Sequence, residues 1–183
     1  MEKEFLTRTE RSVTLNVTGG KIDSFREQEE TTGTVRVYSN GCIGIAGCLG
    51  QPDEAALTAR AEEALALGIP YPCDLEEALE REDLHEAEII PVPELIPTMQ
   101  RFLDRLGQAC PRFALSNKIT LSYRRDEYRN SQGRHLTSSG RELSLELLVQ
   151  NRGSGNLFDS VLSYSSDRFD EEKLLAQFRE QYD

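Results

Sequence analysis

Apolar and polar side chains alternate near the start of the chain, which predicts β-strands with one covered face. Val13, Leu15 and Val17 follow this period of two and stop at Gly19-Gly20. After the glycine pair the chain continues into the polar stretch EQEETT. This order predicts two antiparallel strands joined at the glycines.

Residues 33–68 predict a hairpin followed by a helix. Val35 and Val37 alternate with polar neighbours, and Asn40-Gly41 supplies the positive φ angles that a tight type I′ turn needs. The returning strand, residues 42–48, contains three small residues, Gly44, Ala46 and Gly47. We expect these small residues to lie beneath a packed helix. With the first two strands, the hairpin predicts a four-strand meander.

The helix after this hairpin has sequence signals at both ends. Pro52 is expected in its first turn, with Asp53 and Glu54 against the positive end of the helix dipole. Gly68 is expected to end the helix, since glycine adopts the left-handed conformation at little cost. One face of the helix is apolar and consists of Leu57, Ala61, Ala64 and Leu65.

The acidic residues 74–88 predict a solvated helix or a mobile connection, with an acidic partner-binding face as the alternative. A second amphipathic helix should follow Pro91 and Pro93 and end at Gly107. Its apolar face consists of Ile96, Met99, Phe102, Leu103 and Leu106. A final helix should begin near Phe169-Asp170, with Leu174, Leu175, Phe178 and Tyr182 on one face.

Between these helices the chain again has the pattern of strands. Alternation predicts strands over residues 113–123 and 143–147, a turn over residues 128–134 and a further strand over residues 161–164. The whole is expected to be an α+β fold, a mostly antiparallel β-sheet covered by helices. Residues 1–183 are treated as one domain, in which residues 1–90 and 91–183 could be duplicated halves.

The formal net charge of −11, from 32 acidic and 21 basic residues, argues against a general nucleic-acid binder. No apolar run has the length of a signal peptide or a membrane span, so we expect a cytoplasmic protein that does not enter membranes. The four cysteines lack Cys-x-x-Cys spacing, which favours reduced thiols over disulfides at Cys42, Cys48, Cys73 and Cys110.

Candidate catalytic groups are few. His85-Glu86 lacks the second histidine of a zinc-protease helix, and His135 is too distant in sequence to supply it. Ser131, Ser138 and Ser139 have no G-x-S-x-G setting. An arginine group could bind an anion but is interrupted by Asp126 and Glu127, which favours a surface charge network; it consists of Arg124, Arg125, Arg129 and Arg134. We therefore predict no catalytic residue, no cofactor site and no metal site.

The strand pair and helix of residues 33–68 resemble the N-terminal domain of the TldD/PmbA family, in which a "G-x-x-VRV-x-x-NG-x-x-G-x-A" strand pair precedes a helix rich in Ala, Glu and Leu. Residues 128–133 are similar to the family's "x-N-S-x-G" turn. The positions that carry the resemblance have structural roles at turns and close contacts; they are Gly33, Arg36, Asn40, Gly41, Gly44, Asn130, Ser131 and Gly133. The usual opening helix is missing, and residues 70–93 are unusually acidic.

The resemblance implies a zinc metallopeptidase family, long labelled modulators of DNA gyrase, that acts on peptides or unfolded proteins. Its zinc ligands lie downstream of the matched region, so the resemblance implies that this chain is a non-catalytic N-terminal scaffold of a longer protein. It further implies a peptide channel and assembly into homo- or hetero-oligomers with a family member. A stand-alone acidic interaction or regulatory module is the alternative.

Overall fold

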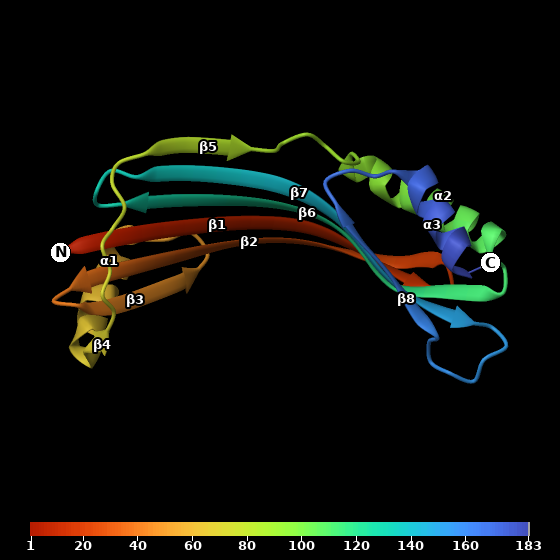
Figure 1. The fold of residues 1–183 in the computed structure, drawn as a ribbon, viewed down its shortest axis with the longest axis horizontal. Helices are drawn as coiled ribbons and strands as arrows, with labels where there is room; N and C mark the ends of the chain where they lie inside the picture. Colours follow the sequence, from red (N-terminus) through yellow and green to blue (C-terminus); the bar gives the residue numbers. More distant parts are fainter. Residues whose placement is uncertain (183) are drawn as a thin grey trace. The chain divides into compact units, whose positions relative to one another are not determined.

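The computed structural model describes residues 1–182, which form eight strands and three α-helices (Figure 1). The strands are β1 (Glu2–Thr18), β2 (Lys21–Ser39), β3 (Cys42–Leu49), β4 (Ile69–Pro70), β5 (Glu80–Leu84), β6 (Phe113–Asn130), β7 (His135–Asn151) and β8 (Ser160–Ser166). The helices are α1 (Glu54–Ala64), which continues into the 3₁₀ turn η1 (Leu65–Leu67), α2 (Val92–Ala109) and α3 (Glu171–Tyr182).

The strands form one sheet in the order β4-β3-β2-β1-β6-β7-β5, and β8 also pairs with β7. The hairpin of β2 and β3 and the pair of β7 and β8 are antiparallel, whereas β5 pairs with β7 in parallel. The predicted α+β class is confirmed. None of the helices within residues 1–182 is long and apolar enough to cross a membrane.

The chain forms two compact units, and each unit consists of three separate segments. The first unit contains Met1–Arg11, Glu29–Glu86 and Arg124–Gly140, and the second contains Ser12–Gln28, Ala87–Tyr123 and the chain from Arg141 onward. The units interleave along the sequence, so they do not coincide with residues 1–90 and 91–183. The four long strands β1, β2, β6 and β7 each contribute residues to both units.

In the first unit, the predicted hairpin is present. Asn40 and Gly41 have φ angles of 52° and 71°, as a type I′ turn requires. The register pairs Val35 with Ala46 and Val37 with Gly44, which places all four on one face of the sheet. That face packs against α1 in a small buried core made of Val35, Val37, Ala46, Leu57 and Ala61.

Helix α1 follows its sequence signals with one correction. The Asp53 carboxylate accepts a hydrogen bond from the Ala56 backbone N–H at 3.1 Å, so Asp53 is the N-cap residue. Pro52 therefore lies before the helix and not in its first turn as predicted. At the other end, Gly68 closes η1 with a φ of 62°, which confirms the predicted stop.

The second unit holds the larger core, where α2 and α3 pack on the sheet strands. The predicted face of α3 is buried, and so is most of the predicted face of α2. The exception is Ile96, which is 39% exposed, while Leu95 is fully buried. Leu95 lies one helical turn before Met99 and so shares its face. The helix also ends two residues beyond Gly107, at Ala109.

Two predicted boundaries are wrong because strands continue through polar sequence. Strand β2 runs without a break from Lys21 to Ser39, so the meander has three strands and not four. The side chains of residues 23–30 are exposed, and their main-chain groups pair with a neighbouring strand. The sequence there has no alternation of apolar and polar residues that would predict a strand. Strand β6 likewise extends to Asn130, and only residues 131–134 are left for the turn.

The acidic residues 74–88 are not helical. Residues 71–79 form an extended connector, and the next five residues form β5, which pairs with residues 135–139 of β7. Every side chain of β5 is exposed, so its position depends on main-chain pairing alone. Of the two forms predicted for this segment, the solvated helix is wrong, because charge content does not indicate a strand partner that lies far along the chain.

Candidate functional site

Gly33 and Gly44, two positions that carry the family resemblance, allow α1 and the residue Pro52 before it to pack directly on the hairpin. A Cβ atom at Gly44 would lie 1.9 Å from the Ala61 carbonyl oxygen, and one at Gly33 would lie 2.5 Å from the Pro52 Cβ. No larger side chain fits at either position without movement of the backbone or the ring. Ala46 also belongs to this interface. Gly47 faces the opposite side of β3, so its predicted place beneath the helix is wrong.

Asn130 organises the second family turn. Its side chain is almost fully buried, and its Oδ1 accepts hydrogen bonds from the backbone N–H groups of Gln132 at 2.9 Å and Arg134 at 3.0 Å. Its Nδ2 donates to the Glu76 carbonyl oxygen at 2.9 Å. Gly133 completes the turn with a φ of 85°. One asparagine therefore closes the turn and holds a segment more than fifty residues away in sequence.

Ser131 joins the same turn to the first strand. Its backbone N–H donates to the Lys3 carbonyl oxygen at 2.9 Å, and its Oγ accepts from the Lys3 N–H at 3.0 Å. Both bonds use the main chain of β1. The hydroxyl is therefore engaged in holding the start of β1 and is not a free nucleophile.

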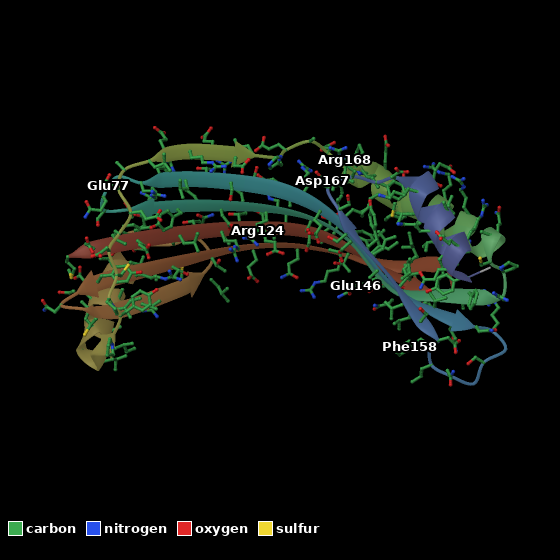
Figure 2. All side chains as sticks on the ribbon, in the orientation of Figure 1. Glu77, Arg124, Glu146, Phe158, Asp167 and Arg168 are labelled. Atoms are coloured by element: carbon green, nitrogen blue, oxygen red, sulfur yellow. The ribbon has the colours of Figure 1, made fainter. Side chains whose placement is uncertain are left out.

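The connector, residues 71–79, runs from β4 to β5 past the ends of the intervening strands (Figure 1). The Tyr71 N–H donates to the Gly41 carbonyl oxygen at 2.7 Å, and Arg134 Nε donates to the Glu77 carbonyl oxygen at 3.1 Å. Glu77 is labelled on this segment in Figure 2. The connector is thus bonded to both family turns.

Glu4 is the centre of a polar network on the face of the sheet opposite α1. Its carboxylate accepts hydrogen bonds from the Tyr38 hydroxyl at 2.5 Å and the Tyr128 hydroxyl at 2.6 Å. Arg36 approaches it at 3.6 Å and balances its charge. Arg36, a family position, therefore supports a largely buried carboxylate. No local sequence pattern indicates this network, because its members come from three separate strands.

The network keeps its phenols protonated. Burial raises the pKa of Tyr128 to about 12, and its hydrogen bond to Glu4 acts in the same direction. Burial and the same carboxylate also raise the pKa of Tyr38 and of the Cys73 thiol. At neutral pH these groups are hydrogen-bond donors and not bases or nucleophiles.

The arginine group is dispersed over separate ion pairs and does not form one anion site. The pairs are Arg124 with Asp126 at 2.7 Å, Arg125 with Glu86 at 3.8 Å, Arg134 with Glu76 at 2.5 Å, and Arg129 with both Glu54 and Glu127. Burial alone would raise the pKa of Asp126, but hydrogen bonds from Arg8 and Arg124 lower it. The structure therefore favours the predicted surface charge network.

The histidines lie apart, and each faces one carboxylate. His85 Nε2 lies 3.1 Å from Asp83, and His135 Nε2 lies 3.4 Å from Glu127. Ser139 is four residues along the same strand from His135, which is about 13 Å. Across residues 1–182, no three His, Cys, Asp or Glu side chains are grouped so that they could hold a metal ion. The side chains of residues 1–182 thus do not fit a zinc site, and no disulfide joins the four cysteines.

Residues 7–68 match the family model described as PmbA/TldA metallopeptidase domain 1. The predicted resemblance to the N-terminal domain of the TldD/PmbA family is confirmed over these residues. The match includes the hairpin with Gly33 and Gly44 and the whole of α1, whereas the second turn of the resemblance, residues 128–133, lies outside it. None of the curated proteins compared with the chain matches it.

Solved structures extend the likeness in fold over nearly the whole chain. TldE from Thermococcus kodakarensis is 14% identical with a TM-score of 0.74, and a putative modulator of a DNA gyrase from Thermotoga maritima is 13% identical with a TM-score of 0.73. Each comparison covers 99% of this chain and 44% of the other. A putative modulator of DNA gyrase from Bacteroides thetaiotaomicron is 10% identical, with a TM-score of 0.63, 100% coverage of this chain and 45% of the other. The chain spans less than half the length of these family structures.

A shallow hollow lies beside α1 in this family domain. Its volume is about 500 Å³, and it is lined by Phe5 of β1 and by Glu54, Ala55, Thr58, Ala59 and Glu62 of α1. Ion pairs border the hollow where Glu54 meets Arg129 and where Glu62 meets Lys3 at 2.9 Å. This hollow was not among the sequence predictions, although the small side chains of Ala55 and Ala59 on a second face of α1 indicate room for close approach.

The hairpin also leaves one strand edge open. Strand β4 pairs with β3 only at Cys42 and Ile43, so residues 44–49 have a partner strand on one side alone. An edge of this kind presents main-chain N–H and C=O groups that another strand can bind. This edge and the α1 hollow are the features of the first unit that a peptide could contact.

Proposed function

We propose that this chain is a non-catalytic scaffold domain of a TldD/PmbA-type peptidase and helps to enclose a channel for peptides or unfolded segments. The observation that carries the proposal is the bonding of the family turns. Asn130, Ser131 and the Glu4 network direct their polar groups at the domain's own backbone and side chains. Groups that hold one another in this way position a structure and do not act on a substrate.

The family resemblance supports the peptidase context of the proposal. The zinc chemistry would be supplied by ligands outside residues 1–182, since these residues offer no grouped metal ligands. The substrate would be a peptide or an unfolded protein, reached through the longer protein. Assembly with a second family member, either a like or an unlike subunit, would complete the channel in the cytoplasm.

A zinc and peptidase assay on the 183-residue chain tests the proposal. We expect less than about 0.1 zinc per chain after exposure to excess zinc and dialysis, because structural sites need about four ligands. We also expect no cleavage of an unfolded casein substrate. Stoichiometric zinc bound in the nanomolar range, together with zinc-dependent cleavage, would contradict a non-catalytic role.

A stand-alone acidic interaction module is the second candidate, and the net charge of −11 favours it. The acidic residues 74–88 are partly committed within their own units, because Glu76, Glu86 and Glu88 lie against Arg134, Arg125 and Arg141. A basic peptide such as oligolysine separates the two candidates. Tight binding of oligolysine that disappears in Glu80→Gln/Glu82→Gln, with no affinity for neutral peptides, would favour the module.

A further inference from the structure

We propose that the open edge of β3, residues 44–49, receives an extended apolar peptide as an added β-strand. This inference rests on the proposed function and deepens it, because it names the surface and the class of peptide. A free strand edge favours an extended peptide as its ligand, because the main chain of that peptide can pair with the donors and acceptors of the edge. Side chains beside the edge then select among peptides.

The edge is accessible in the first unit. Beyond the two residues that pair with β4, β3 has β2 on one side and, within residues 1–182, no strand on the other. Figure 1 shows β3 at the margin of this part of the sheet, next to β2. Ile45 is 52% exposed and Leu49 is 76% exposed. These two side chains share a face and flank Gly47, so they form an apolar strip along the free edge.

Edge strands of natural proteins are normally protected from pairing by charged side chains, proline or bulges. Strand β3 has none of these protections, because its sequence CIGIAGCL contains neither a charged residue nor proline, and its pairing with β2 is continuous. Strand β5, an edge of the same unit, has the opposite character. Its sequence EREDL is charged at four of five positions.

Strand β8 provides a second comparison, because it is also uncharged and pairs only with β7. Four of its seven residues are serine, and charged residues follow it at Asp167 and Arg168, both labelled in Figure 2. It therefore lacks the apolar strip of β3. An apolar peptide should favour the β3 edge over this one.

Charge further defines the occupant. Two copies of a chain with a net charge of −11 repel each other, which disfavours pairing of β3 with a second copy. The same charge attracts a basic segment and does not repel a neutral one. The occupant inferred here is an extended peptide with apolar residues at alternate positions and without acidic residues.

Binding of a fluorescein-labelled peptide tests the inference. The probe alternates valine and threonine over about eight residues, the length of a typical strand, and carries lysine at each end. A matched probe has N-methyl groups on alternate residues along one edge, which removes main-chain donors and keeps the side chains. We expect binding of the first probe and at least about tenfold weaker binding of the second, since several hydrogen bonds are lost.

Surface substitutions locate the binding edge. Ile45→Lys places a charge on β3 and should weaken binding of the probe by about fivefold, whereas Val161→Lys on β8 and Leu84→Lys on β5 should change it by less than about twofold. All three positions are exposed, and circular dichroism checks that each variant folds. Sedimentation velocity on the wild type and on Ile45→Lys tests for a second copy at the edge.

Each outcome has a defined meaning. The inference is supported if N-methylation of the probe weakens binding and if Ile45→Lys is the one substitution of the three that weakens binding. Equal binding of both probes, equal effects of the three substitutions, or a dimer that Ile45→Lys dissociates overturns the β3 edge as a peptide site. The first two of these results still leave peptide binding by the domain intact. Failure of the wild-type chain to bind either probe overturns both the inference and the peptide role proposed above.

Discussion

Gly44 of β3 lies directly beneath the carbonyl oxygen of Ala61, at a distance that leaves no room for a side chain between strand and helix. A Cβ atom at this position would stand 1.9 Å from that oxygen. The contact fixes α1 on the hairpin and explains why a glycine is needed in an otherwise apolar strand. It is also one of the family positions within the matched residues 7–68.

Substitution of Gly44 by alanine should destabilise the chain. We expect Gly44→Ala to lower the free energy of unfolding by about 1–3 kcal/mol, because the helix backbone must move to admit one methyl group. Gly107→Ala is the matched control, since a Cβ at that helical position meets nothing within 4 Å. Gly107→Ala should be neutral or stabilising by up to about 1 kcal/mol. Urea unfolding measures both, and equal effects would contradict the close contact.

Adjacent residues of α2 should respond very differently to truncation. Leu95→Ala should cost about 2–5 kcal/mol of unfolding free energy, because Leu95 is fully buried. Ile96→Ala should cost less than about 1 kcal/mol, because Ile96 is 39% exposed and loses less packing. Thermal or urea unfolding compares the two variants. A larger loss for Ile96→Ala would show that the helix presents the other face to the sheet.

The hairpin and the helix faces could be predicted because the sequence signals for them are local. Asn40-Gly41 specifies a turn through its own backbone preferences, and the spacing from Leu174 to Phe178 repeats with one helical turn. Strand β5 could not be predicted, since residues 80–84 pair with residues 135–139 through main-chain groups that every sequence has. The Glu4 network was missed for a related reason: Glu4, Tyr38 and Tyr128 meet only after three strands align.

Asn130 should hold the connector through its amide nitrogen. Asn130→Asp keeps the oxygen that accepts from the turn but removes the donor to the Glu76 carbonyl oxygen. We expect a loss of about 1–3 kcal/mol and faster backbone hydrogen exchange in residues 71–79, because a buried acceptor loses its partner. Gln132→Glu makes the same chemical change on an exposed side chain and should shift stability by less than about 0.5 kcal/mol. Unchanged exchange in Asn130→Asp would remove the proposed role of the connector bond.

The Glu4 network predicts a high-pH titration step. The pKa of Tyr128 is raised to about 12 in the folded chain, above the usual value of about 10. Its contribution to stability should therefore be complete below about pH 10 and be lost as the pH rises toward 12. Ultraviolet absorbance follows phenolate formation. Tyr128→Phe should remove one component near pH 12, and Glu4→Gln should lower the pKa of the remaining raised phenols. Tyr123→Phe is the control and should leave the high-pH component in place.

Hydrogen exchange of the chain with and without the valine–threonine probe shows where a bound strand protects the backbone. We expect added protection to be concentrated in residues 44–49 of β3 and to be absent with the N-methylated probe. Protection confined to β8 or to the turn at residues 131–134, or no protection at any position despite saturating probe, would contradict the β3 edge as the peptide site.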